Sequence, residues 1–157
     1  MECVDIRQCD YPVFHDLLEA YYREGEDADT PQEELDSFVR MMFDMVIRGE
    51  IEGCFAENDG IAVGFCLWTV DSEGSAFSEK PGYGTILEIG LSAPYRSSGL
   101  GSELVSRTED RFRNAGIAQC YVSAYGPAEQ FWSACGYRRS GETAENGLPI
   151  MTKCLLP

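Results

Sequence analysis

The chain has 157 residues, with 27 acidic and 12 basic side chains and a formal net charge of −15 at pH 7. This charge argues against nucleic acid and anionic membranes as partners. The acidic residues are concentrated early: residues 1–79 hold 20 acidic and 4 basic side chains, whereas residues 80–157 hold 7 and 8. The asymmetry fits either an ordinary solvated acidic face or two halves that meet ligands of opposite charge.

Length and cysteine pattern set further bounds. A chain of this size predicts a single domain over residues 1–157. It has no apolar run of membrane-spanning length, and its first residues lack the pattern of a signal peptide, so we expect a cytoplasmic protein. The seven cysteines show no Cys-x-x-Cys spacing, and His15 is the single histidine. We therefore expect reduced thiols and no metal site.

Two helices are predicted in the first third of the chain. Apolar residues recur at helical spacing from Pro12 to Tyr21, and an acidic, non-periodic segment follows. The sequence Thr30-Pro31-Gln32-Glu33 is typical of a helix start, with threonine as the N-cap, proline at the first helical position and Glu33 closing a capping box. The buried stripe of this second helix is predicted to contain Leu35, Phe38, Met42, Met45 and Val46.

Strands dominate the rest of the chain. Residues 58–60, Asn-Asp-Gly, have the composition of a hairpin turn. The element order predicts an α/β (α+β) domain with a single mixed central sheet flanked by helices. Strands are predicted at residues 3–6, 54–57, 61–70, 85–91, 118–124, 137–140 and 150–155, and further helices at residues 99–114 and 127–135.

The segment that follows the strand at residues 85–91 combines a basic residue, two serines and two glycines before a helix begins. At a strand-to-helix junction, free backbone N–H groups and the positive end of the helix dipole converge. Gly99 and Gly101 let the backbone approach a ligand closely, and Arg96 adds a positive charge. The segment matches neither the P-loop nor the dinucleotide-binding fingerprint. It is either an anion cradle or a glycine-rich corner.

Its context resembles a known family. Residues 96–101, Arg-Ser-Ser-Gly-Leu-Gly, match the Arg/Gln-x-x-Gly-x-Gly/Ala loop of the GNAT family of acetyl-CoA-dependent N-acetyltransferases, and Pro94-Tyr95 precede it as in many members. The close resemblance covers residues 83–140, and the first half of the chain agrees only in element order. It implies an acyl-CoA N-acyltransferase fold with a mostly antiparallel sheet, and acetyl-CoA as the acyl donor without a metal.

The resemblance implies roles around the donor. Backbone N–H groups of the loop would bind the pyrophosphate of coenzyme A, and the preceding strand would pair with the pantetheine arm. A backbone N–H near Leu91 would stabilise the oxyanion. Phe131 and Trp132 would pack against the pantetheine arm, or form helix core. The implied donor-binding residues are Ile89, Gly90, Leu91, Arg96, Ser97, Ser98, Gly99, Leu100, Gly101, Ser102, Tyr125, Phe131 and Trp132.

Two chemical groups are needed for transfer to an amine. An ordinary alkylammonium has a pKa of about 10.4, so it must lose a proton before it attacks. Glu88 lies in an apolar strand three residues before Leu91, where family members place a general base; its alternative is a structural hydrogen-bonding role. The tyrosine that protonates the leaving thiolate in the family is replaced here by Trp132. Four alternatives remain open: the thiolate takes a proton from Tyr125, it takes a proton from water, it leaves unprotonated, or the protein has lost catalysis.

The family's acceptor site lies around the first two helices and their connection. In this chain that region contains Tyr21, Tyr22, Glu24 and Glu26, which would favour a cationic acceptor, either a small-molecule or a peptide amine. An ordinary acidic loop is the alternative. The leading prediction is an N-acetyltransferase that acetylates a primary amine directly. A non-catalytic acyl-CoA-binding regulatory module and a ligand-free oligomeric scaffold are the rivals. A homodimer is compatible with the sequence.

Overall fold

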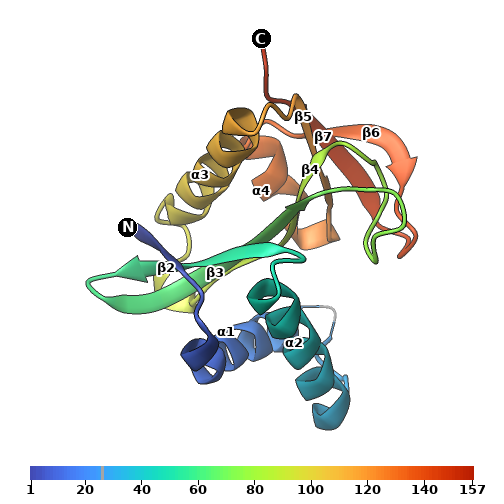
Figure 1. The fold of residues 1–157 in the computed structure, drawn as a ribbon. Coiled ribbons are helices and arrows are strands. Elements are labelled where there is room, and N and C mark those ends of the chain that lie inside the picture. The colour runs from blue at the N-terminus through green and yellow to red at the C-terminus, as the bar shows by residue number, and fades with distance from the viewer. Residues whose placement is uncertain (26) are drawn as a thin grey trace. The chain divides into compact units, whose positions relative to one another are not determined.

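A computed structural model describes residues 1–25 and 27–157. The described residues form seven strands and four α-helices in the predicted order (Figure 1). The strands make one sheet in the order β1-β2-β3-β4-β5-β7-β6. The elements are β1 (Glu2–Asp5), α1 (Tyr11–Glu24), α2 (Gln32–Ile47), β2 (Glu52–Asn58), β3 (Ile61–Val70), β4 (Gly84–Leu91), α3 (Leu100–Asn114), β5 (Gln119–Ser123), α4 (Glu129–Ala134), β6 (Arg138–Thr143) and β7 (Pro149–Cys154).

Contacts divide the chain into two compact units. The first comprises residues 1–67 and 88–104, and the second comprises residues 68–87 and 105–157. The division therefore falls inside β3, β4 and α3. None of the helices in the described ranges is both long enough and apolar enough to cross a membrane.

In the first unit, α1 and α2 pack against each other. Phe43 of α2 contacts the rings of Tyr11 and Phe14 of α1, with centroids 5.0 and 5.2 Å apart. β1 pairs antiparallel with β2. The predicted hairpin turn between β2 and β3 is confirmed: Asp59 and Gly60 both have positive φ, of 52° and 77°, as a two-residue turn that matches the twist of the strands requires.

The predicted start of α2 is wrong in detail. The helix begins at Gln32, Pro31 occupies the N-cap position in an extended conformation, and no side chain of the described residues caps the helix. The Thr30 hydroxyl donates to Asp27 Oδ1 instead, at 3.4 Å. The predicted stripe is confirmed as buried at Leu35 and Met42; Val39 and Phe43 are buried as well, whereas Phe38, Met45 and Val46 are half-buried.

The second unit combines parallel and antiparallel strand pairs. β4 pairs parallel with β5, and β7 pairs antiparallel with β5 and with β6. Asp71 fixes the connection between β3 and β4: its carboxylate accepts hydrogen bonds from the Tyr121 hydroxyl (2.7 Å) and from the N–H groups of Glu79 and Lys80 (2.8 and 2.7 Å). Burial alone would raise the pKa of Asp71, but these hydrogen bonds outweigh it and the pKa is lowered.

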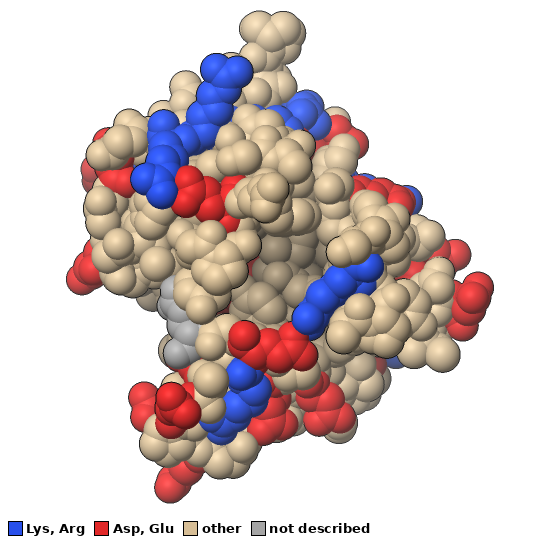
Figure 2. Space-filling view, turned by 180° about the vertical axis from the view of Figure 1, so that it is seen from behind, with Lys and Arg blue, Asp and Glu red and all other residues tan. Residues whose placement is uncertain are grey.

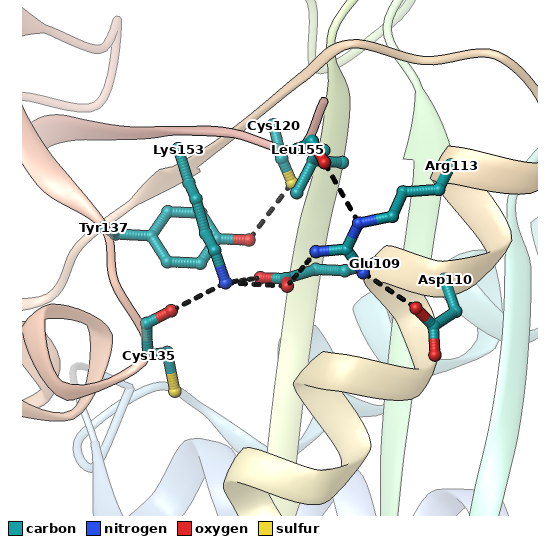
Figure 3. A network of polar contacts seen from close by, with 8 residues as sticks. All are labelled: Glu109, Asp110, Arg113, Cys120, Cys135, Tyr137, Lys153 and Leu155. Atoms are coloured by element: carbon teal, nitrogen blue, oxygen red, sulfur yellow. Dashed lines mark hydrogen bonds and ion pairs between the residues drawn. The ribbon is translucent and has the colours of Figure 1, made fainter. Parts of the chain in front are cut away.

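A buried charge network ties α3 to the last strand. Glu109 is only 2% exposed, and its carboxylate accepts two hydrogen bonds from Lys153 Nζ, at 2.9 and 2.7 Å. Arg113 donates to the same carboxylate at 3.3 Å and to the carbonyl of Leu155 at 3.1 Å (Figure 3). Because a buried carboxylate is costly unless it is paired, these partners account for its place in the core.

The cysteines agree with the expectation of reduced thiols. The described residues contain seven free cysteines, of which Cys54, Cys66 and Cys120 are buried. Cys120 Sγ lies 3.0 Å from the Tyr137 hydroxyl (Figure 3), and burial raises the pKa of the Cys120 thiol to about 12. A thiol that stays protonated is a poor nucleophile, so Cys120 is a core residue.

The network predicts an asymmetric mutational effect. Lys153→Met should leave Glu109 with Arg113 as its cationic partner. The free energy of unfolding should therefore decrease by about 3 kcal/mol, the lower end of the range for a broken buried ion pair. Lys80→Met, which removes an ion pair with the exposed Glu142, should cost about 1 kcal/mol or less. Urea denaturation of both variants measures the difference; equal losses would contradict the structural importance of the buried pair.

Candidate functional site

The loop between β4 and α3 turns its backbone twice into the left-handed region. After a short 3₁₀ helix, Ala93–Tyr95, Ser97 has φ of 57° and Gly99 has φ of 86°. The Ser98 hydroxyl donates to the carbonyl of Tyr95 at 2.6 Å, and the Gly99 carbonyl accepts the first helical hydrogen bond from Glu103 (3.0 Å). The predicted helix start at residue 99 is thus confirmed to within one residue.

This geometry suits an anion. Residues 96–99 are exposed, and a Cβ on Gly99 would meet no atom of the described residues within 4 Å. The first N–H groups of a helix have no partner inside the helix and carry the positive end of its dipole. The backbone beside Gly99, at the start of α3, is therefore open to a ligand such as a phosphate.

Arg96 is already engaged by two groups. Its Nε donates to the carbonyl of Leu91, the last residue of β4, at 2.8 Å, and its Nη2 forms an ion pair with Glu24 Oε2. The family resemblance of the sequence implies a donor-binding role for Arg96 and an acceptor-side role for Glu24. The structure brings these two residues into direct contact, which local sequence patterns do not indicate because 72 positions separate them.

The face of β4 that carries Glu88 also carries Gly90, because alternate strand residues share a face. A Cβ on Gly90 would lie 2.9 Å from Tyr21 Cδ2 and 2.9 Å from Phe65 Cε1, so the Tyr21 ring rests directly on this glycine. The rings of Tyr21 and Phe65 meet edge to face, with centroids 5.4 Å apart. The end of α1 therefore lies against the part of β4 that contains the candidate base.

Tyr22 places a buried hydroxyl beside Glu88. The side chain is 5% exposed and packs edge to face against Tyr21 and Phe38. Burial raises the pKa of Tyr22 well above its ordinary value, and the negative charge of Glu88 adds to the effect. Within residues 1–25 and 27–157, the Tyr22 hydroxyl makes no hydrogen bond of normal geometry, so its interaction with the Glu88 carboxylate, which contributes to the raised pKa, is a weak one. A buried hydroxyl without a partner costs about 1–3 kcal/mol.

Arg23 closes the connection between α1 and α2. Its Nη1 donates to the carbonyls of Asp27 (3.3 Å), Ala28 (3.2 Å) and Thr30 (2.5 Å), and its Nη2 donates to the side chain of Gln32. The arginine is thus committed to backbone carbonyls. Helical periodicity and charge do not predict this role, although an arginine that directly precedes an acidic, non-periodic segment is a signal for it. Glu26, a predicted acceptor residue, lies outside the described residues.

The remaining candidates belong to the second unit. Tyr125 is 39% exposed. Trp132 is buried and packs edge to face against Phe131 and Tyr137, with centroids 5.1 and 5.2 Å apart. Phe131 is half-buried. The structure therefore gives Trp132 a core role in its own unit, which is one of the two roles predicted for it.

One group of a histidine and two acids is a candidate for metal binding. Ligand atoms of His15, Asp16 and Glu19 lie within 4.8 Å of one another. His15 Nε2, however, is 2.7 Å from Asp36 Oδ1, and this hydrogen bond raises the pKa of the imidazole. Asp36 thus already engages one ring nitrogen of His15, and partly exposed carboxylates around a histidine are common without a bound ion.

The chain is similar to proteins of known fold. The family model described as the acetyltransferase (GNAT) family matches residues 11–137. No match is found among curated protein sequences.

Three solved structures illustrate the likeness. The PaiA N-acetyltransferase from Thermoplasma acidophilum, in complex with coenzyme A, has 15% identity and a TM-score of 0.73 over 98% of both chains. Aminoglycoside 6'-acetyltransferase type Ii has 18% identity and a TM-score of 0.68 over 100% of this chain and 99% of that chain. The ribosomal-protein-alanine N-acetyltransferase from Brucella melitensis has 12% identity and a TM-score of 0.72 over 98% of this chain and 99% of that chain. At these identities the likeness shows a shared fold.

The contact between Gly90 and Tyr21 predicts a strong effect of a single methyl group. Gly90→Ala should force Tyr21 or Phe65 out of its place and reduce the free energy of unfolding by about 1–3 kcal/mol. Gly126→Ala is the matched control, since a Cβ on Gly126 would meet no described atom within 4 Å. Thermal denaturation of both variants tests this; a Gly90→Ala protein as stable as the control would show that the ring does not rest on β4.

Proposed function

Because this chain belongs to the acetyltransferase (GNAT) family, we propose that it transfers an acetyl group from acetyl-CoA directly to a primary amine, without a covalent enzyme intermediate. The observation that carries the proposal is the loop after β4, with its left-handed Ser97 and Gly99 and the start of α3 behind them. Bound acetyl-CoA would supply the activated thioester carbonyl. Binding, orientation and proton transfer would then fall to this chain's own residues.

The donor residues fall into two groups. Backbone N–H groups of residues 97–102 would bind the diphosphate, with Arg96 as an additional cation. The main chain of residues 89–91 would hold the pantetheine arm, and the N–H of Leu91 would donate to the carbonyl oxygen as negative charge develops on it. The exposure of the loop and the open space beside Gly99 among the described residues support this assignment.

Glu88 is the proposed general base. As the amine nitrogen bonds to the carbonyl carbon and the carbon–sulfur bond breaks, the carboxylate accepts the proton that the nitrogen loses. The position of Glu88 beside Tyr22 and on the same face as Gly90 supports this role. Trp132 is not a proton donor to the departing sulfur, so the thiolate either takes a proton from Tyr125 or water, or leaves unprotonated, since a thiol has a pKa of about 8.5.

Tyr21 and Tyr22 are proposed to contact the acceptor, and the acidic first half of the chain favours a cationic one. Acidic side chains are prominent on the face that Figure 2 shows, in agreement with the net charge of −15. The similar proteins named above include an aminoglycoside acetyltransferase and a ribosomal-protein-alanine acetyltransferase. Both a small-molecule amine and a peptide amine are therefore acceptors to test.

Glu88→Gln tests the proposed chemistry. The variant should still bind acetyl-CoA, so that saturating acetyl-CoA raises the melting temperature of both proteins by a few degrees. Acetylation should fall by about 10²–10⁴-fold because the base is lost. Mass spectrometry of a panel of diamines, an aminoglycoside and basic peptides measures the product without interference from cysteine thiols.

The matched control for this variant is Glu57→Gln, which removes another strand carboxylate and should leave turnover unchanged. Unchanged turnover in Glu88→Gln would remove Glu88 from its proposed role. Binding of acetyl-CoA by the wild-type protein without transfer to any amine of the panel would favour the non-catalytic binding module.

Tyr22→Phe separates a functional hydroxyl from a structural one. Since the hydroxyl is buried without a partner among the described residues, the free energy of unfolding should stay the same or rise, by up to about 1 kcal/mol. The value of kcat/KM for the best amine of the panel should fall by about two- to tenfold, as expected for one lost hydrogen bond.

Tyr121→Phe is the comparison for Tyr22→Phe. Its hydroxyl donates to Asp71, so this variant should be less stable by about 1.5–3 kcal/mol. Urea denaturation and steady-state kinetics of both variants together show whether the Tyr22 hydroxyl serves the stability or the activity of the protein. A Tyr22→Phe protein that loses stability and keeps full activity would assign the hydroxyl to the fold alone.

A further inference from the structure

The cation of the proposed donor loop is paired with an acidic residue of the same chain. Arg96 is the only basic residue between Lys80 and Arg107, and its guanidinium pairs with the carboxylate of Glu24. An anionic donor that approaches the loop therefore meets an ion pair rather than a free arginine. In a chain with a net charge of −15, the loss of this one local positive charge matters for a polyanionic ligand.

The pair is built so that a stronger anion can replace Glu24. The side chains of Arg96 and Glu24 are 47% and 50% exposed, and exposed ion pairs contribute little net stability. A diphosphate offers several charged oxygens to the planar guanidinium, which favours it over a single carboxylate. The hydrogen bond from Arg96 Nε to the Leu91 carbonyl does not involve Glu24, so it can hold the guanidinium in place during the exchange.

The position of Glu24 links this exchange to α1. Glu24 is the last residue of α1, and Tyr21 and Tyr22 lie in the same final turn. The neighbouring Arg23 donates to three backbone carbonyls, so it is not available to neutralise Glu24 in place of Arg96. A carboxylate released from Arg96 would thus add a negative charge at the end of α1.

We propose that Glu24 determines the affinity of the site for its donor, as an internal counter-ion that the diphosphate of coenzyme A must displace from Arg96. This inference rests on the proposed function, because the donor it names is the donor proposed there. Binding then exchanges one ion pair for another instead of adding one. The affinity of the wild-type protein for coenzyme A is accordingly lower, and less sensitive to salt, than the loop would otherwise give.

Calorimetric titration of coenzyme A into the 157-residue chain tests the proposal. Glu24→Gln should bind coenzyme A about two- to fivefold more tightly than the wild type, in line with the strength of an exposed pair. Its affinity should also fall more steeply as salt is raised, because a new ion pair now forms on binding. In an Arg96→Gln background, the change Glu24→Gln should have no effect on affinity.

Asp29→Asn is the matched control, since it removes one exposed negative charge from the same connection between α1 and α2 and should leave the affinity nearly unchanged at about 0.15 M salt. If Asp29→Asn and Glu24→Gln increased the affinity for coenzyme A equally, net charge alone would explain the effect, and the proposal would be overturned. Weaker binding by Glu24→Gln would overturn it as well, because Glu24 would then hold Arg96 ready for the donor. If the wild-type protein bound no coenzyme A, the proposed donor site would itself fail; normal wild-type binding with an unaltered affinity of Glu24→Gln would refute only the role of Glu24.

Discussion

The alternation of side chains along β4 is the constraint on which the candidate site depends. It places Glu88 and Gly90 on one face of the strand, and the missing side chain of Gly90 lets Tyr21 lie against the backbone. This contact brings the last turn of α1 to the strand, and Tyr22 and Glu24 come with it. A shift of one residue in β4 would turn Glu88 away from α1 and remove the glycine from under the ring.

Local patterns in the sequence were sufficient to predict the elements and the position of the loop after β4. The Asn-Asp-Gly turn and the helical periodicities depend on residues close in the chain, and the structure confirms them. The start of α2 was mispredicted because the Thr30 hydroxyl bonds to Asp27 and its carbonyl accepts from Arg23. The capping pattern shows that Thr30 could cap the helix, but in the structure its hydroxyl and its carbonyl make other hydrogen bonds.

The two long-range ion pairs could not be predicted from local sequence patterns. Glu109 with Lys153, and Glu24 with Arg96, join residues that lie 44 and 72 positions apart. Their pairing follows from which elements become neighbours in the fold, and composition says only that acids outnumber bases. The two pairs also differ physically: the first is buried and stabilises α3 against the last strand, whereas the second is half-exposed and can exchange its anion at little cost.

The Tyr22 hydroxyl has a consequence for how this protein responds to selection. If turnover requires this hydroxyl, as proposed, then activity and not stability favours keeping it. A laboratory population selected for heat resistance alone, with no demand for turnover, should lose this hydroxyl early and keep the rest of the aromatic cluster. The order in which substitutions arise in such a population would then mark the boundary between residues that build the fold and residues that serve the reaction.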